Sequence, residues 1–323
     1  MKKALAPSAL TRLQQVFGSR LQENIVLANY STARVGGKAD AALVIRAADE
    51  LEQAVRLLWE MDVPYYILGS GSNVLISDAG VRGVVLINHS HNIKVDIRSQ
   101  PPTVWAESGA ILVTVARQAA LRGLTGLEWA CTIPGTVGGA VYGNAGAFGG
   151  DIQHNLSLVE ILHRNQGRQT WTVDQMQYAY RTSVLKQSAG DAVILAARFH
   201  LQPGDPAEIQ AKMESLSAQR RAKQPMGASM GSMFKNPPGD FAGRLIEAAG
   251  LKGTRSGDAE ISPVHANFFI NKGKASAADI YSLVVLARQK VYEKFHINLE
   301  LEIELVGDWR ADKGSNNSIE AER

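Results

Sequence analysis

The densest run of small residues in the sequence is Ile133-Pro134-Gly135-Thr136-Val137-Gly138-Gly139-Ala140, which resumes as Asn144-Ala145-Gly146-Ala147-Phe148-Gly149-Gly150. Seven of the 30 glycines in the chain fall within Gly135–Gly150. Glycine and alanine remove side chains along a whole stretch of backbone. A flat ligand can then lie against the main chain, or a helix can pack closely on a strand. Ligand contact and close packing are both open at this point.

A second small-residue loop, Gly69-Ser70-Gly71-Ser72-Asn73, directly follows a predicted strand at Pro64–Leu68. Such a loop can turn successive backbone N–H groups toward a pyrophosphate, with Ser and Asn side chains as further donors. No third glycine opens a helix here and no Gly-Lys-Ser/Thr occurs in the chain, so the dinucleotide fingerprint and the P-loop are excluded. The alternative is a tight connection between two strands. Together the two glycine-rich stretches favour one long dinucleotide held between two α+β subdomains.

The composition is that of a globular protein. The chain has 323 residues, of which 45% are hydrophobic and 20% charged, with a net charge of +3. This balance excludes a disordered chain and gives no sign of a nucleic-acid partner. Apolar runs such as Ala192–Ala197 are far shorter than the roughly 18–20 residues of a membrane helix, and Pro7 interrupts the short apolar start, so we expect a cytoplasmic protein without a membrane partner. The single cysteine, Cys131, excludes an internal disulfide.

The pattern of apolar residues divides the chain into segments. Residues 1–24 are expected to form an amphipathic helical lead-in, with Leu21 at the end of its apolar stripe. Two α+β subdomains are expected at about 25–88 and 89–203, followed by a C-terminal α+β domain at 206–308 and a polar tail at 309–323.

Local signals predict several element boundaries. They are a helix capped by Asp49, a helix from Asp205-Pro206 to about Lys223, a strand at His265–Ile270, a capping box of Ser276 and Asp279 that opens a helix at 277–295, and a strand at Leu299–Val306.

Several polar residues are candidates for chemistry. Arg181, after Tyr180, can bind a carboxylate with two donors, although a lone arginine in a turn more often makes a surface ion pair. Ser232 lies in a small-residue turn with Lys235 and Asn236. Glu300, Glu302 and Glu304 alternate along the predicted strand and would share one face, which is solvated in the alternative reading. Arg221 and Lys223, with Arg220, are candidate diphosphate contacts or simply a solvated helix end. The seven histidines show no ligand spacing, so no metal is expected.

Taken in order, seven motifs resemble the UDP-N-acetylenolpyruvoylglucosamine reductase family, also called UDP-N-acetylmuramate dehydrogenases. They are Thr32-Ala33-Arg34-Val35-Gly36-Gly37, Leu68-Gly69-Ser70-Gly71-Ser72-Asn73, Ile133-Pro134-Gly135-Thr136-Val137-Gly138-Gly139, Asn144-Ala145-Gly146-Ala147, Tyr180-Arg181, Gly231-Ser232-Met233-Phe234-Lys235-Asn236-Pro237 and Leu299-Glu300-Leu301-Glu302. Each motif is weak alone, but the resemblance covers about residues 29–307.

The resemblance implies an α+β fold: a two-subdomain FAD-binding domain of the p-cresol methylhydroxylase (vanillyl-alcohol oxidase) type at 25–203 and a C-terminal substrate-binding domain. It implies non-covalent FAD, NADPH as co-substrate, and reduction of UDP-N-acetylglucosamine-enolpyruvate to UDP-N-acetylmuramate, a step in peptidoglycan synthesis and so in cell wall biogenesis. Hydride passes from N5 of reduced FAD to C3 of the enolpyruvyl ether, and Ser232 gives a proton to C2. Arg181 and Glu302 match the residues that stabilise the enol carboxylate.

By the same resemblance, the residues expected to bind the cofactor are Arg34, Gly69, Ser70, Gly71, Ser72, Asn73, Ile133, Pro134, Gly135, Thr136, Gly138, Gly139, Asn144 and Ala145. The matching motifs also place Tyr180, Arg181, Lys235 and Asn236 among the residues expected to bind substrate. Arg221 and Lys223 are added to them as the candidate diphosphate contacts, and a monomer is expected.

One feature departs from the family pattern, and another distinguishes its subclasses. Thr132, after Cys131, stands where the family usually has glycine. Only Gln202–Pro206 separates the second subdomain from the next helix, which matches the subclass that lacks a tyrosine-bearing loop. The alternative functions are another flavin oxidase of this fold, acting on a sugar or hydroxy acid, and an inactive nucleotide-binding module.

Overall fold

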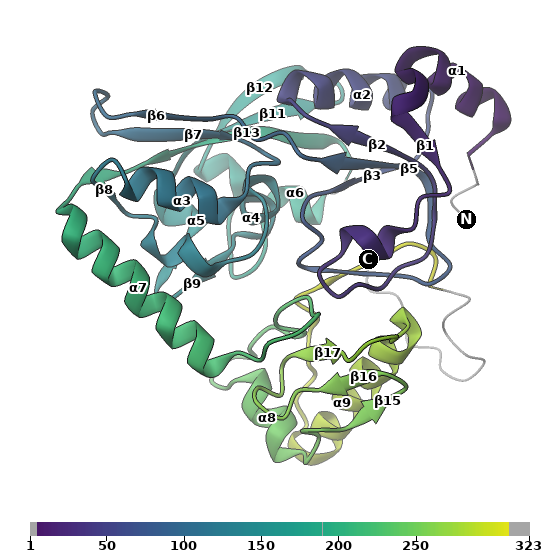
Figure 1. The fold of residues 1–323 in the computed structure, drawn as a ribbon, viewed down its shortest axis with the longest axis vertical. Helices are drawn as coiled ribbons and strands as arrows, with labels where there is room; N and C mark the ends of the chain where they lie inside the picture. The colour runs from purple at the N-terminus through teal and green to yellow at the C-terminus, as the bar shows by residue number, and fades with distance from the viewer. Residues whose placement is uncertain (1–4, 189, 310–323) are drawn as a thin grey trace. The chain divides into compact units, whose positions relative to one another are not determined.

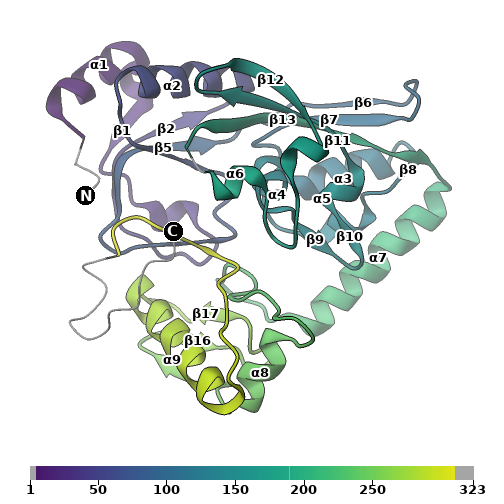
Figure 2. The same cartoon turned by 180° about the vertical axis from the view of Figure 1, so that it is seen from behind.

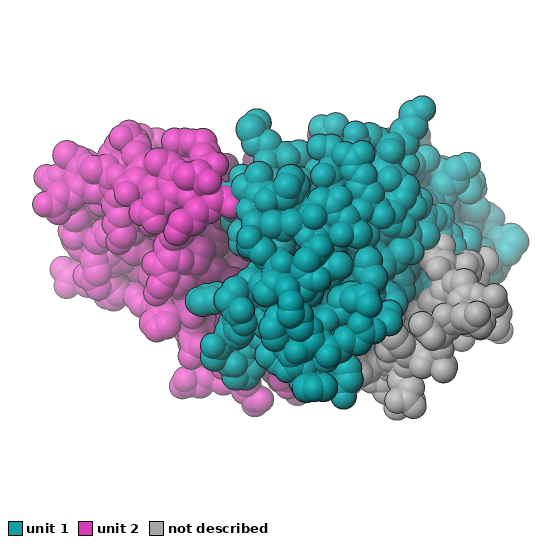
Figure 3. Space-filling model, turned by 90° about the horizontal axis from the view of Figure 1, so that it is seen from below, with its two compact units in different colours: residues 1–42, 71–85, 224–323 teal, residues 43–70, 86–223 magenta. Residues whose placement is uncertain are grey.

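A computed structural model describes residues 5–188 and 190–309, and these form two compact units, both discontinuous in sequence (Figure 3). Unit 1 comprises the described residues of 1–42, 71–85 and 224–323, and unit 2 comprises those of 43–70 and 86–223. The expected polar tail at 309–323 lies outside the described residues except for Trp309, which is buried.

Unit 2 is built on a five-stranded antiparallel sheet of order β12-β11-β13-β7-β6 (Figure 1). Its strands are β6 (Ile93–Asp96), β7 (Thr103–Glu107), β11 (Leu156–His163), β12 (Gly167–Thr172) and β13 (Ala192–His200). Helix α2 (Ala48–Glu60) covers one face, and α3 (Leu112–Ala120) and α4 (Val137–Gly143) cover the other.

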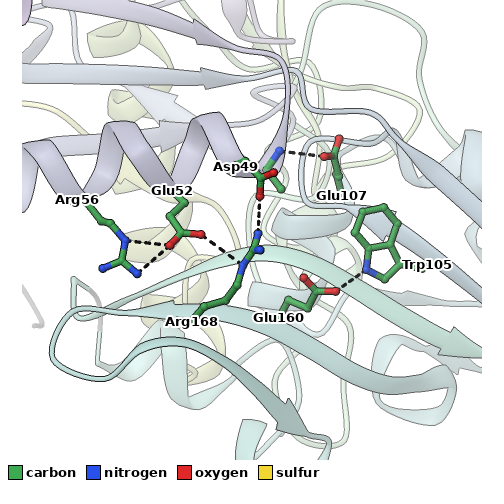
Figure 4. Close-up of polar contacts among 8 residues, drawn as sticks. Asp49, Glu52, Arg56, Trp105, Glu107, Glu160 and Arg168 are labelled. Carbon is green, nitrogen blue, oxygen red and sulfur yellow. Dashed lines mark hydrogen bonds and ion pairs between the residues drawn. The ribbon is translucent and has the colours of Figure 1, made fainter. Parts of the chain in front are cut away.

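Helix α2 begins differently from the prediction. Asp49 does not cap it; instead Glu107, buried on β7, accepts the Ala48 N–H at 2.9 Å (Figure 4). The Asp49 carboxylate reaches across to Arg168 of β12 at 2.9 Å. A carboxylate distant in sequence therefore does the capping, and the local candidate ties the helix to the sheet.

A four-stranded sheet of order β1-β2-β5-β3 follows the lead-in helix. Its strands are β1 (Leu21–Glu23), β2 (Ala39–Ile45), β3 (Tyr65–Leu68) and β5 (Val81–Asn88), and the unit boundary falls within β2 and β5. The lead-in helix α1 spans only Pro7–Phe17, because Gly18 ends it at φ +57°. Leu21, expected on the helix stripe, instead starts β1.

The C-terminal part of unit 1 contains the sheet β15-β16-β17, and α9 (Ala277–Phe295) packs against it (Figure 2). The predicted capping box is confirmed, since Ser276 and Asp279 each accept the other's backbone N–H. The apolar stripe of α9 is buried in one core with Phe234. Before it, the Asp205 carboxylate caps α7 (Pro206–Lys223), as predicted, by accepting two N–H groups at 2.9 Å.

The predicted strand at Leu299–Val306 is shorter than expected. Only β18 (Glu304–Val306) forms, parallel to β4 (Val74–Ile76), and Leu301 makes one isolated bridge to Phe234. Glu300, Glu302 and Glu304 therefore do not share one strand face. The strand predicted at His265–Ile270 is likewise shifted to β17 (Phe269–Asn271).

The remaining elements are short. They are η1 (Gly18–Arg20), η2 (Leu27–Tyr30), β8 (Leu124–Thr125), η3 (Glu128–Thr132), β9 (Gly146–Ala147), β10 (Gly150–Asp151), α5 (Ile152–Asn155), η4 (Asp174–Met176), α6 (Val184–Gln187), β14 (Gln202–Pro203), α8 (Ala242–Ala248), β15 (Arg255–Ser256) and β16 (Ala259–Ile261). Among the described residues, none of the helices has the length and apolarity to cross a membrane, and no group of three His, Cys, Asp or Glu could hold a metal ion.

Candidate active site

The glycine-rich stretch of unit 2 forms a loop that leads into α4. Thr136 caps this helix, its hydroxyl accepting the Gly139 N–H at 3.4 Å. Gly69 lies directly against it, because a Cβ on Gly69 would be 2.6 Å from Thr136 Oγ1. Two predicted cofactor segments, 67 residues apart at these positions, are thus brought together within unit 2.

Close packing explains one glycine of α4 and not the next. A Cβ on Gly138 would stand 2.9 Å from the Cβ of Ser108, whose carbonyl accepts the Gly138 N–H at 2.7 Å. A Cβ on Gly139 would meet only Thr136, at an ordinary 3.6 Å, and Gly139 is exposed. Close packing within the protein therefore does not explain the glycine at position 139.

Unit 1 holds the other part of the predicted cofactor segments. Gly71 has a φ of +63°, and a Cβ there would be 2.2 Å from the carbonyl oxygen of Tyr30. Its own carbonyl accepts from the backbone and hydroxyl of Thr32, at 3.1 and 3.2 Å. The exposed Arg34, at a φ of +56°, lies two residues after Thr32. The contacts of Thr32 with Gly71 therefore join the segment that carries this cation to a loop with little side-chain bulk, a combination that suits a phosphate ester.

Ser232 and Glu302 are brought together in unit 1 by backbone pairing. The Ser232 segment is extended: Ser232 bridges to Phe268 on one side, and Phe234 bridges to Leu301 on the other. The Glu302 N–H donates to the Met233 carbonyl at 3.0 Å. Both candidate catalytic residues are half-buried.

Asn73 links the serine- and glycine-rich loop to the same place. Its amide donates to the Glu302 carbonyl at 3.1 Å, and its own carbonyl accepts the Glu304 N–H at 2.9 Å. A residue predicted to bind the cofactor therefore fixes the backbone of a predicted catalytic residue.

Lys235 and Asn236 also make structural contacts. Lys235 Nζ lies 3.2 Å from Glu300 Oε2, and the Asn236 side-chain oxygen accepts the Ala242 N–H at 3.1 Å, at the start of α8. Asn236 is exposed and Lys235 is only partly buried, so both remain open to a ligand.

Arg181 lies in unit 2 in a left-handed conformation, with φ +58°. Its Nη2 donates to the Gly146 carbonyl of β9 at 2.8 Å, and its guanidinium lies 5.5 Å from the centre of the exposed Tyr180 ring. A backbone carbonyl and an aromatic ring therefore both contact the guanidinium. Asn144, also with positive φ, ends α4 and donates to the Ala179 carbonyl at 3.2 Å.

The end of α7 accounts for the departure at Thr132. Arg220 donates to the Thr132 hydroxyl at 3.3 Å, and burial lowers the pKa of Arg220. The exposed Arg221 lines an open groove of about 390 Å³ beside the buried Cys131, and Lys223 is exposed in the same helical turn. Thr132 therefore contacts helix α7.

Sequence reasoning missed Asn267. This buried residue, 3% exposed, hydrogen-bonds the Ser232 segment through its side chain. The sequence gives one sign of it: Asn267 is an amide within the strand predicted at His265–Ile270.

Two protein-family models match the chain, each over a different part of the sequence. Residues 39–172 match the FAD binding domain, and residues 222–306 match the UDP-N-acetylenolpyruvoylglucosamine reductase C-terminal domain. A reductase of that name from Chloroflexus aurantiacus is 44% identical over 283 residues, covering 87% of this chain and 95% of the relative. The chain belongs to the UDP-N-acetylenolpyruvoylglucosamine reductase family.

Two further relatives agree. The family member from Geobacillus kaustophilus is 40% identical, covering 92% of this chain and 97% of that protein. The crystal structure of UDP-N-acetylenolpyruvylglucosamine reductase (MurB) from Thermus caldophilus is 35% identical with a TM-score of 0.76, covering 89% of this chain and 99% of that one. The family and the α+β architecture of an FAD-binding domain with a C-terminal domain are confirmed.

Proposed function

We propose that the chain is an NADPH-dependent flavoenzyme that reduces UDP-N-acetylglucosamine-enolpyruvate to UDP-N-acetylmuramate, a peptidoglycan precursor. The observation that supports it most is the pairing that holds Ser232 beside Glu302, with Asn73 bound to the same backbone. Family membership and this arrangement together favour the reductase over a flavin oxidase of the same fold or an inactive module.

The residues present fit FAD. Gly139 is exposed, and a Cβ built there would meet only Thr136. Arg34 offers a cation on the segment whose Thr32 hydrogen-bonds Gly71. When bound, FAD would accept a hydride from NADPH and supply one to the substrate. The residues proposed to hold it are Arg34, Gly69, Ser70, Gly71, Ser72, Asn73, Ile133, Pro134, Gly135, Thr136, Gly138, Gly139, Asn144 and Ala145.

Three side chains are assigned to the substrate chemistry. Hydride addition to C3 builds negative charge on the enol carboxylate, and a fixed guanidinium such as that of Arg181 stabilises this growing charge. Ser232 holds the proton that is delivered to C2. Glu302 is assigned, with Arg181, to stabilising the enol carboxylate of the substrate.

The residues proposed to bind the rest of the substrate are Tyr180, Lys235, Asn236, Arg221 and Lys223. We assign FAD binding to residues 25–203 and substrate binding to 206–308. We further assign the chain to the subclass without the tyrosine loop, since β14 runs almost directly into α7. We also propose that the protein is a cytoplasmic monomer.

Anaerobic reduction of the bound flavin by NADPH tests the proposed function. The purified holoprotein should lose its absorbance near 450 nm on addition of NADPH and regain it, without oxygen, on addition of the enolpyruvyl UDP-sugar. An oxidase would regain absorbance only after oxygen is admitted. Failure of the UDP-sugar to restore the absorbance would refute the proposed substrate.

A further inference from the structure

Asn267 is a buried amide whose two polar atoms both meet one residue of the Ser232 segment. Its Nδ2 donates to the Phe234 carbonyl at 2.8 Å, and its Oδ1 accepts the Phe234 N–H at 2.9 Å. Its backbone carbonyl accepts the Met233 N–H at 2.8 Å. Asn267 is only 3% exposed, so these are contacts shielded from water.

This pattern is a strand pairing made by a side chain. In an antiparallel ladder, two opposed residues exchange both an N–H and a C=O, and a side-chain amide offers the same donor and acceptor. Strand β17 begins only at Phe269. The Asn267 amide thus extends the pairing toward Ser232 beyond the end of the strand.

Phe234 is held from its other side as well, by its bridge to Leu301. The backbone N–H of the next residue, Lys235, donates to the backbone carbonyl of Glu300 at 2.9 Å. On the N-terminal side of Ser232 stands Gly231, with φ +80° and no heavy atom within 4 Å of a Cβ built there. Ser232 itself bridges to Phe268, and the two residues that follow it, Met233 and Phe234, are held by Asn267.

We propose that Asn267 is the positioning residue of Ser232: it fixes the backbone that aims the serine hydroxyl, without touching substrate itself. This inference rests on the proposed function, in which Ser232 gives a proton to C2. It predicts that Asn267 affects the step that oxidises the flavin far more than the step that reduces it.

The test compares Asn267→Leu with Val284→Ala in the holoprotein. Val284 is 1% exposed in the same core as Phe234, so its truncation destabilises that core without altering the amide. Stopped-flow absorbance of the flavin measures both half-reactions. We expect Asn267→Leu to slow reoxidation by the enolpyruvyl sugar about 100-fold, with a raised solvent deuterium isotope effect, and to leave NADPH reduction within about threefold.

Hydrogen exchange read by mass spectrometry gives a second measurement. Amides of residues 231–236 should exchange faster in Asn267→Leu than in Val284→Ala. Equal exchange, or equal slowing of both half-reactions, would overturn the positioning role.

Asn267→Asp keeps the inference testable if the leucine variant does not fold. A protonated carboxyl offers one donor and one acceptor, as the amide does, whereas the carboxylate only accepts. Relative to the unsubstituted protein, reoxidation should recover as the pH falls and the buried carboxyl is protonated. A flat ratio across pH would contradict the role.

Ser232→Ala separates the two claims. Slow reoxidation in Ser232→Ala with normal reoxidation in both Asn267 variants would overturn only the inference about Asn267. Normal reoxidation in Ser232→Ala would overturn the proton-donor role and the inference with it.

Discussion

At the scale of single residues, Arg181 is the side chain whose chemistry is easiest to isolate. Its guanidinium is oriented by the Gly146 carbonyl and lies over the ring of Tyr180. Arg181→Lys keeps the charge but replaces a planar fork with a single ammonium point charge. We expect flavin reoxidation by the enolpyruvyl sugar to fall about 10²–10³-fold, as when one oriented donor is lost, with NADPH reduction largely unchanged.

Arg168→Lys is the matched control. Arg168 is also an arginine of unit 2, but it binds Asp49 and Glu52 at a half-exposed site (Figure 4). Its replacement should leave both half-reactions unchanged, because exposed ion pairs contribute little. If Arg181→Lys behaves as this control does, Arg181 only supports the β9 hairpin.

At the scale of elements, helix α4 separates packing from ligand contact. Gly71 and Gly138 are poor test positions, since a Cβ at either would overlap protein atoms. Gly139→Leu has space within the protein, so we expect a folded variant with an unchanged or higher melting temperature. If FAD lies against Gly139, forced overpacking at the contact weakens binding by about 1–3 kcal/mol, or roughly 5- to 150-fold in Kd.

Gly143→Leu is the control in the same helix. No heavy atom lies within 4 Å of a Cβ built at Gly143, and we assign it no ligand. Titration of each apoprotein with FAD, followed by fluorescence quenching, measures Kd. Equal affinities for the two variants would remove Gly139 from the cofactor site.

At the scale of the whole molecule, His265 links folding to pH. Burial lowers the pKa of His265 from its model-peptide value of 6.5, and the nearby Lys252 adds to this. Its Nδ1 accepts the Asn267 N–H at 3.2 Å, a contact that suits the neutral ring. Below about pH 6.5 the unfolded chain binds a proton that the folded chain resists. Stability from this residue is therefore present above that pH and lost as the pH falls.

Thermal melts at about pH 7.5 and pH 5.5 test this. The melting temperature of His265→Gln should fall less between the two pH values than that of the unsubstituted protein. Identical pH dependence in His265→Gln and the unsubstituted protein would rule out His265 as the linked group.

Features set by neighbouring residues were predictable from the sequence. The Ser276–Asp279 box and the Asp205 cap depend on spacings of two or three residues at the start of one helix, and both were confirmed. The family was also predictable, because seven short motifs occur in the right order. The roles of Ser232, Arg181 and Glu302 remain predictions.

Tertiary structure decided what depends on distant partners. Glu107, and not Asp49, caps α2, because the fold places this buried carboxylate of β7 within hydrogen-bond distance of the Ala48 N–H. The strand predicted at Leu299–Val306 was reduced to its last three residues, because only those find a continuous partner, in β4. Asn267 acquires its place only through pairing with Phe234, 33 residues away. A backbone hydrogen bond is satisfied by whichever group the fold brings within reach, and local sequence does not encode that choice.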